Sequence, residues 1–305
     1  MRRLAVLLAA TSTTPAVAQQ DLSKVEIRVE RVAPGIAVLF GSGGNIGLSY
    51  GEDGNVIIDD QFAPLVPKIQ ASVKSIDPDP VRFVINTHWH GDHTGGNEAF
   101  GTAGAVIVAH DNVRRRMSAD TFSKQMNETL KATPKAGLPV VTFARGVNFH
   151  LNGDTLQVTH VDNAHTDGDS LVYWAKANVI HMGDTFFFKA TYPFIDRESG
   201  GSIDGMIAAA KTGLGIVKPG GRVIPGHGPL ATREDLQAYH AMLVDVRAKV
   251  AAGIRAGRSK AAVIASRPTA AYDGKVATNG FIKPDRFVET MYDELKSKLQ
   301  PARRR

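Results

Sequence analysis

Three histidines and one aspartate lie within six residues in the segment His88-Trp89-His90-Gly91-Asp92-His93. Histidine and aspartate are seldom buried without partners, so packing alone does not account for this density. Imidazole and carboxylate are, however, ligands that Zn²⁺ and similar divalent ions take in proteins. The preceding residues 81–86 predict a short buried strand, and Gly91 and Gly95-Gly96 predict turns. The sequence therefore predicts a metal-binding loop at the end of a strand, with a satisfied polar loop as the alternative.

Three further residues have the type and the position of metal ligands. His165 lies in a loop between two predicted strands, and Asp184 and His227 each follow a predicted strand directly. Taken alone, each of these residues is more simply interpreted as an ordinary surface residue. Together with the cluster at 88–93, they favour a shared metal site. The other five histidines are predicted to be structural: His110, His150, His160, His181 and His240.

The elements that must position these residues fall into two halves. In the first, four short strands with glycine-rich turns (26–29, 36–40, 46–50 and 56–59) are followed by a helix around residues 65–73. The second half begins with a hairpin at Asn152-Gly153 and continues with strands at 171–174, 179–181 and 222–224. Helices follow at 203–214, from Thr232 onward and at 284–295, with N-caps predicted at Ser202 and Thr232. No linker separates the halves, which predicts two sheets packed face to face with helices outside. The sequence predicts no particular role for residues 118–140 and 257–305.

The N-terminus resembles an export signal. Arg2 and Arg3 precede an apolar run at 4–10, and Ala16-Val17-Ala18 matches a small-residue cleavage site. The run is too short to span a bilayer, which disfavours a membrane anchor. We predict a signal peptide at residues 1–18, one domain at 19–305 with a C-terminal helical extension, and a periplasmic or secreted protein. The chain has no cysteine, which excludes thiolate ligands and disulfides.

The net charge gives little support for a polyanionic partner. Removing residues 1–18 removes two arginines and no acid, so the formal charge falls from +6 to +4. The dense basic runs, at 114–116 and 303–305, are better interpreted as a solvated face and a frayed tail. We expect a small-molecule substrate, no nucleic acid, and no membrane after signal removal; the oligomeric state is not predicted.

The complete series of motifs, between about residues 36 and 230, resembles the metallo-β-lactamase superfamily. The residues that carry the resemblance are His88, His90, Asp92, His93, His165, Asp184 and His227. The resemblance implies an α/β (α+β) fold, a four-layer αββα sandwich with a two-metal site at one edge of the paired sheets.

The resemblance also implies how the ligands divide. His88, His90 and His165 would hold one metal, Asp92, His93 and His227 the second, and Asp184 would bridge them. Two Zn²⁺ ions are expected, with Fe or Mn as alternatives. Two dications about 3.5–4 Å apart repel, and a shared carboxylate offsets that repulsion. Asp59, at the end of a predicted strand, is expected to orient an imidazole, with a simple turn residue as the alternative.

The implied function is an exported di-zinc hydrolase, in which a metal-bound hydroxide attacks a carbonyl and Asp92 holds the nucleophile in place. A β-lactam amide is the first substrate considered, and a lactone, thioester or other ester is the alternative. One lactamase group has Cys where this chain has Asp184 and another lacks an acid there, so the ligand set is closer to general hydrolases. A di-iron redox protein and a non-catalytic metal-stabilised binding protein remain as alternatives of other classes.

Two loops are expected to flank the substrate cleft. Residues 41–45 are glycine-rich, and residues 186–199 are rich in aromatic side chains. Tyr192 and Phe194 flank Pro193, which disfavours a regular core helix, so we expect them to form an apolar wall beside the metals. For Phe186 to Phe188, core packing is an equal alternative.

Overall fold

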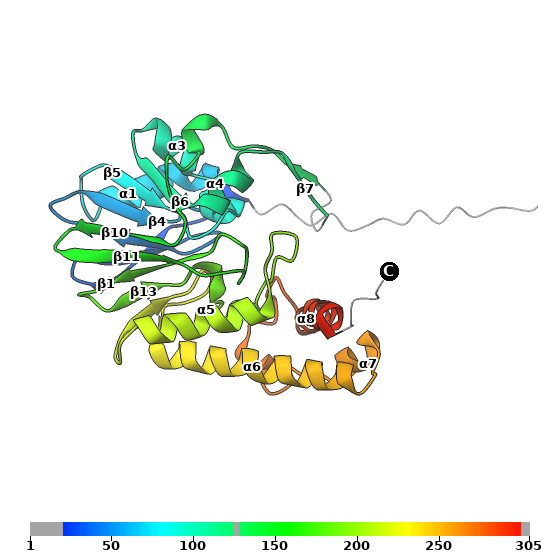
Figure 1. Cartoon of the computed structure of the whole chain (residues 1–305). Helices are drawn as coiled ribbons and strands as arrows, with labels where there is room; N and C mark the ends of the chain where they lie inside the picture. Colours follow the sequence, from blue (N-terminus) through cyan, green and yellow to red (C-terminus); the bar gives the residue numbers. More distant parts are fainter. Residues whose placement is uncertain (1–20, 125–127, 300–305) are drawn as a thin grey trace, which may run out of the picture.

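The computed structural model describes residues 21–124 and 128–299, which fold into four layers. Two sheets pack face to face, and helices cover the outer face of each (Figure 1). This is the αββα sandwich that the sequence predicted. The predicted signal peptide at 1–18 and the basic run at 303–305 lie outside the described residues.

The first sheet contains seven strands in the order β1-β2-β3-β4-β5-β6-β9. Their bounds are β1 Arg28–Ala33, β2 Ile36–Phe40, β3 Ile46–Ser49, β4 Asn55–Ile58, β5 Val81–Ile85, β6 Val106–His110 and β9 Val141–Phe143. The first four pair antiparallel, as the predicted meander requires, and β4, β5, β6 and β9 pair parallel. The first strand begins two residues later than predicted and extends to Ala33, where it pairs with β2.

The second sheet contains six strands in chain order. Their bounds are β10 Gly146–Leu151, β11 Asp154–His160, β12 Ser170–Trp174, β13 Val179–His181, β14 Arg222–Ile224 and β15 Ala231–Thr232. The predicted turn at Asn152-Gly153 joins β10 to β11, and both residues have positive φ (53° and 69°). Asparagine and glycine tolerate this left-handed conformation, which explains why this dipeptide sets the hairpin register.

The helices divide between the two outer layers. The first sheet is covered by α1 Val66–Lys74, α2 Gly91–Thr94, α3 Asn97–Thr102 and α4 Asp111–Met117 (Figure 1). The second half contributes α5 Ile203–Ile216, α6 Arg233–Arg255, α7 Lys260–Ala265 and α8 Pro284–Leu299. Both predicted N-caps are present: the Ser202 side chain accepts the Gly205 N–H, and Thr232 forms a capping box with Asp235. None of the described helices is long and apolar enough to cross a membrane.

The core between the sheets is made by side chains that alternate along the strands. Trp174, Leu156, Val38 and Ile58 belong to one buried cluster that joins the two sheets. The strand β12 is buried along its whole length, as expected of a central strand covered on both faces. This packing fixes the strand ends from which the site residues extend.

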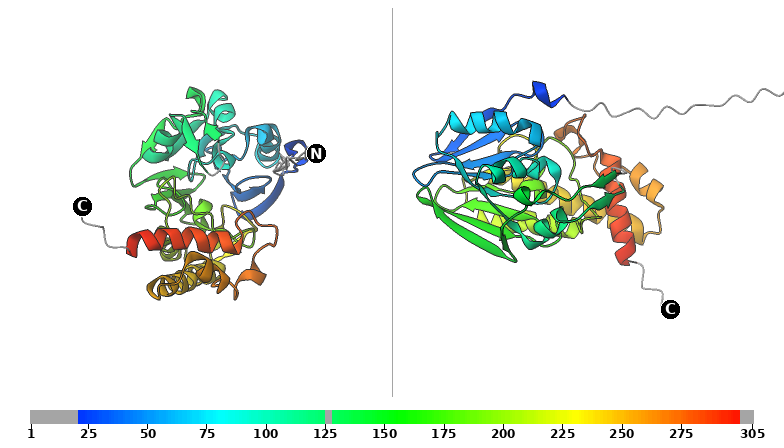
Figure 2. Two further views of the ribbon diagram at one scale, coloured as in Figure 1. Left: turned by 90° about the vertical axis from the view of Figure 1, so that its right-hand side faces the viewer. Right: turned by 90° about the horizontal axis from the view of Figure 1, so that it is seen from above.

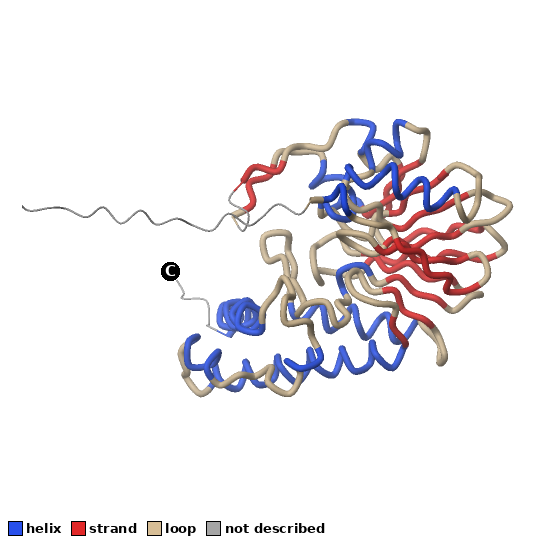
Figure 3. The backbone as a smooth tube through the Cα atoms, turned by 180° about the vertical axis from the view of Figure 1, so that it is seen from behind, coloured by secondary structure: helices blue, strands red, loops and turns tan. Residues whose placement is uncertain are grey.

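Residues 118–140, to which the sequence assigned no role, include a two-stranded arm. Strands β7 Thr121–Ser123 and β8 Glu128–Leu130 pair antiparallel and project from the sandwich on the side where α8 lies (Figures 2 and 3). The backbone N–H of Lys124 donates to the Glu198 carboxylate at 3.1 Å. The arm therefore contacts the long loop that follows β13.

Candidate metal centre

The predicted ligands come from four connecting segments, each adjoining the end of a strand, and the first of these segments includes the one-turn helix α2. The segment 88–93 follows β5, His165 lies between β11 and β12, Asp184 follows β13 and His227 follows β14. The sandwich brings these four segments to the same edge, although they span 140 residues of the chain, so the structure unites all seven residues that the sequence proposed. The five other histidines belong to none of the described clusters.

The seven residues form three overlapping groups, in each of which the potential ligand atoms lie within 4.8 Å of one another. The groups are His88, His90 and His165; His88, His93 and Asp184; and Asp92, His93 and His227. The first and third match the two ligand sets that the resemblance implied. The second contains one histidine of each set, His88 and His93, together with Asp184.

Asp184 lies between the two sets. Its Oδ2 is 3.6 Å from Nε2 of His165 and 3.3 Å from Nε2 of His227, and its Oδ1 is 3.1 Å from Nε2 of His93. One carboxylate therefore faces imidazoles of both sets. This is the arrangement required of a residue that bridges two cations.

Two imidazoles of the first set, those of His90 and His165, are each fixed by one ring nitrogen. His90 Nε2 lies 2.9 Å from the Asp196 carboxylate, and His165 Nδ1 lies 2.8 Å from the carbonyl oxygen of Phe194. Both nitrogens must donate to these acceptors, so in the neutral imidazoles His90 Nδ1 and His165 Nε2 each carry a lone pair. These two lone pairs face each other at 2.9 Å, a contact that is repulsive unless a cation or a proton lies between them.

His93 is fixed in the same way by Asp59. Its Nδ1 lies 2.7 Å from Asp59 Oδ2, while the two oxygens of Asp59 also accept the backbone N–H and the hydroxyl of Thr87. Asp59 has a φ of 64°, an unfavourable conformation that aspartate tolerates better than most residues. The expected orienting role of Asp59 thus has a geometric basis, and His93 Nε2 is left facing Asp184.

Sequence reasoning did not find Asp196. This carboxylate is 106 residues from His90 in the chain and also accepts the backbone N–H groups of Glu198 and Ser199. It lies in an irregular loop without a motif or a periodic pattern, so only the fold reveals its contact with His90.

Burial and the cluster of charges shift the ionisation of the site residues. Burial lowers the pKa of His88 well below its usual value and that of His165 to about 4, which keeps both imidazoles neutral and able to act as ligands. Burial alone would lower the pKa of His227, but the carboxylates of Asp184 and Asp92 outweigh it and raise the pKa to about 9. For Asp184, burial opposes ionisation, but His227 and His93 hold its pKa well below the usual range. The same carboxylates raise the pKa of His93 well above its usual value, so without metal the protons on His93 and His227 balance the charges of Asp92 and Asp184, and a cation bound there would displace these protons.

Two further observations show that the residues present fit a metal centre. His88 Nε2 is buried and has no hydrogen-bond partner, although an orphaned buried nitrogen is costly. Two glycines allow close packing around the ligands: a Cβ at Gly226 would lie 2.0 Å from Asp184 Oδ1, and one at Gly44 2.1 Å from Cε1 of His93. The donors are nitrogen and oxygen only, a set that suits zinc, iron or manganese.

The expected cleft loops have a mixed outcome. The loop at 41–45 does lie against the site, since Gly44 N–H donates to the Asp92 carbonyl at 3.0 Å. Phe194 contacts both His90 and His165, with ring centroids 5.8 and 5.4 Å away.

The expectation for Tyr192 is wrong, because the loop turns this side chain into the core formed by helices α5 to α8. Tyr192 is 1% exposed, its ring stacks on Phe287, and its hydroxyl forms a hydrogen bond with Asp273.

Of the three consecutive phenylalanines, two are buried. Phe186 is fully buried and contacts Tyr239, which places it in the core. Phe187 is 5% exposed and its ring lies parallel to that of His227, with centroids 5.5 Å apart. Phe188 is partly buried against the same core. Core packing therefore accounts for the position of Phe186, whereas the ring of Phe187 packs against His227, one of the candidate metal ligands.

Comparison with known proteins agrees with this geometry. The family model of the metallo-β-lactamase superfamily matches residues 39–238, and the chain belongs to this superfamily. A metallo-β-lactamase from Pontibacter korlensis superposes with a TM-score of 0.58 at 18% identity, covering 72% of this chain and 100% of that one. The DIM-1 metallo-β-lactamase gives 0.59 at 16% identity, covering 72% and 98%.

A third solved structure extends over more of the chain. The stereoselective inverting sec-alkylsulfatase Pisa1 from Pseudomonas sp. superposes with a TM-score of 0.65 at 15% identity, covering 88% of this chain and 50% of that one. At these identities the likeness concerns the fold. The chain is thus a member of a hydrolase superfamily with clusters of histidine and aspartate able to bind metal.

Proposed function

We propose that this protein is a two-metal hydrolase, with zinc as the preferred ion, that cleaves a carbonyl substrate. The observation that carries the proposal is the position of Asp184, whose two oxygens face imidazoles of both ligand sets. A buried carboxylate with imidazole nitrogens on both sides has the ligand types and the position to be shared by two dications. When bound, two such ions would supply an activated water and an electrophile for the carbonyl oxygen.

The chain's own residues then have distinct roles. His88, His90 and His165 would hold one ion, Asp92, His93 and His227 the other, and Asp184 both. Asp92 is the most exposed of the seven, at 26% of its side chain, and its Oδ2 lies 3.3 Å from His227 Nε2. A ligand carboxylate that reaches the open side of the site can accept a hydrogen bond from the attacking water, so we assign Asp92 the role of aligning that water.

For the substrate we propose a cyclic amide of the β-lactam kind, with a lactone, thioester or other ester as the alternative. The two lactamase structures above support the first. A sulfate ester is a second candidate, because the sec-alkylsulfatase superposes over 88% of this chain, against 72% for the two lactamases.

Metal analysis and a substrate panel test the proposal together. Mature protein purified without chelator should contain close to two ions per chain by elemental analysis, chiefly zinc. It should hydrolyse at least one member of a panel of chromogenic cephalosporins, lactones, thioesters, aryl esters and aryl sulfates. A chain that neither contains nor takes up metal would refute the metal centre, and metal-loaded protein inactive on the whole panel would refute the hydrolase.

We also propose that the protein is exported and acts on a small molecule in the periplasm or medium. The basic start, the short apolar run and Ala16-Val17-Ala18 support cleavage after Ala18. Mass spectrometry of the exported protein should find Gln19 at the N-terminus, and a product that retains Met1 in the cytosol would contradict export. Of the basic run at 114–116, Arg115 and Arg116 are ion-paired with Asp167, which supports a structural use of these charges.

A further inference from the structure

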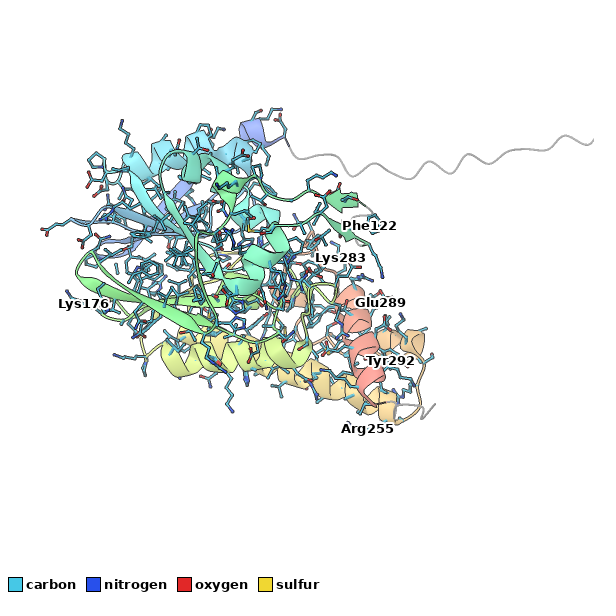
Figure 4. The ribbon with its side chains drawn as sticks, turned by 45° about the horizontal axis from the view of Figure 1, so that its top comes forward. Phe122, Lys176, Arg255, Lys283, Glu289 and Tyr292 are labelled. Atoms are coloured by element: carbon cyan, nitrogen blue, oxygen red, sulfur yellow. The ribbon has the colours of Figure 1, made fainter. Side chains whose placement is uncertain are left out.

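A cavity of about 240 Å³ lies beside the candidate metal centre, at the junction of three elements. One wall is the loop segment 193–198, the second is the start of α8 with the preceding Ile282, and the third is Lys124 of the β7–β8 arm. Figure 4 shows labelled residues of two of these elements, Phe122 on the arm and Glu289 on α8. Residues 282–290 lie beyond the part of the chain that the family model matches.

Aromatic rings connect this cavity to the metal ligands. Phe194, which lines the cavity, lies nearly parallel to His90, and it also contacts Phe281, with ring centroids 5.6 Å apart. Phe281 is 68% exposed, in a loop held to residues 189–192 by hydrogen bonds such as Ile282 N–H to Thr191 Oγ1. A large apolar side chain that is exposed and yet held beside a candidate active site is suited to contact a ligand.

Three cationic side chains and two carboxylates line the same cavity. The cations are Lys124, Arg197 and Arg286. Arg197 is paired with Glu294 and Arg286 with Glu289, but a guanidinium has five N–H donors and one ion pair leaves others available. The carboxylates in the lining are engaged: Asp196 accepts from His90, and Glu198 accepts from the Lys124 backbone.

We propose that this cavity binds the remote part of the substrate, an apolar segment that ends in an anionic group. The apolar segment would lie against Phe194, Phe281 and Ile282, and the anion would lie near Lys124 and Arg286. The proposal rests on the proposed hydrolase function, because it places the reacting group at the metal centre next to His90. It assigns Phe281 and Arg286 as residues that determine substrate specificity.

Direct binding of three carboxylates to zinc-loaded protein tests this inference without requiring turnover. Acetate, hexanoate and adipate each have a carboxylate that can bind the metals. Acetate has no further chain, hexanoate has an apolar chain, and adipate has a chain that ends in a second carboxylate. By calorimetry, we expect hexanoate to bind about tenfold more tightly than acetate, since each buried methylene group adds affinity. Adipate should bind several-fold more tightly than hexanoate.

Two variants and one control separate the contributions. Phe281→Ala should abolish most of the advantage of hexanoate over acetate, and Arg286→Gln should abolish the advantage of adipate over hexanoate. Val244→Ala removes another exposed apolar side chain, 43% exposed on α6, and should change neither ratio. Metal content and melting temperature should stay unchanged in all three variants.

The outcomes distinguish this inference from the proposed function. Equal affinity for acetate and hexanoate, or equal effects of Phe281→Ala and Val244→Ala, would overturn the cavity as a substrate site even in an active hydrolase. Chain-dependent binding that is lost in Phe281→Ala would support it even if no substrate of the panel were cleaved, a result that refutes the hydrolase alone.

Discussion

The carboxylate of Glu294 accepts the backbone N–H of Ile203 at 2.9 Å, and none of the Glu294 side chain is exposed. The same carboxylate pairs with Arg197 at 2.9 Å and with Lys298 at 2.7 Å. Arg197 adjoins Asp196, which fixes His90. The C-terminal helix α8 is therefore joined by one buried acid to the loop that orients a candidate metal ligand.

Replacing Glu294 should lower the free energy of unfolding. Glu294→Leu leaves the Ile203 N–H without its acceptor and Arg197 without its ion-pair partner, while Lys298 keeps Asp204. The substitution should cost about 3 kcal/mol of unfolding free energy. Glu294→Gln keeps an acceptor and should cost about 1 kcal/mol. Urea unfolding measures both changes. Lys260→Met is the control, since it removes partly exposed ion pairs of α8 with Glu289 and Asp293 and should cost less than about 1 kcal/mol. Equal losses for Glu294→Leu and the control would contradict this role.

Asp59 and Asp196 should act on different metals. Asp59 accepts a hydrogen bond from the His93 imidazole, and Asp196 accepts one from the His90 imidazole. Loss of such a partner typically weakens metal binding by about 10–100-fold. Asp59→Asn should weaken the second ion and Asp196→Asn the first, and each variant is the control for the other. Asparagine tolerates the positive φ at residue 59, so backbone strain should not confuse the result. Stepwise titration of metal-free protein with Co²⁺, followed by visible absorption, measures the two affinities. Identical losses of both ions in both variants would contradict the assignment.

Asp184→Asn should reduce metal content from about two ions per chain toward one. An amide is neutral and does not offset the repulsion between two dications as a carboxylate does. Elemental analysis after dialysis against buffer at a fixed free-zinc concentration measures the content, and hydrolysis should fall with it. Asp167→Asn removes a nearby carboxylate that binds Arg115 and Arg116 instead, and should leave the content unchanged. Full occupancy in Asp184→Asn would show that this residue does not bridge.

His110 should make the fold less stable in acid. The Nδ1 atom of His110 accepts the Asn112 N–H and caps α4. Burial lowers the pKa of His110, and so does His160, whose ring is stacked on it with centroids 3.7 Å apart. The carboxylates of Asp111 and Asp167 oppose this shift only in part. The unfolded chain then binds a proton more readily, so this contribution to stability is present above the unfolded pKa of 6.5 and falls as the pH drops below it.

His110→Asn tests this pH dependence. Asparagine retains a cap but loses the hydrogen bond to Ala144, so at pH 8 the variant should be about 1 kcal/mol less stable than the parent. The gap should narrow between pH 7 and pH 5, as followed by urea unfolding of metal-free protein. His150→Asn, on an exposed part of β10, is the matched control. A gap that stays constant with pH would show that His110 does not titrate in this range.

The sequence by itself determined the seven candidate ligands and the layered fold. The ligands were visible because imidazole and carboxylate were concentrated in one loop and recurred directly after strands. The strands were visible because apolar residues alternated with turn residues, and helix starts such as Ser202 and Thr232 had local capping signals. All of these are short-range patterns, which a single sequence contains in full.

Tertiary structure alone decided the contacts between residues far apart in the chain. Asp196 reaches His90 across 106 residues and Glu294 reaches Ile203 across 91, and neither carboxylate has a local pattern that marks it. Tyr192 and Phe194 are two residues apart in the same loop, yet one enters the core and the other contacts metal ligands, because the loop's path is set by α8 and by residues 276–283. Such choices depend on which surfaces the packed layers bring together, which periodicity and spacing do not encode.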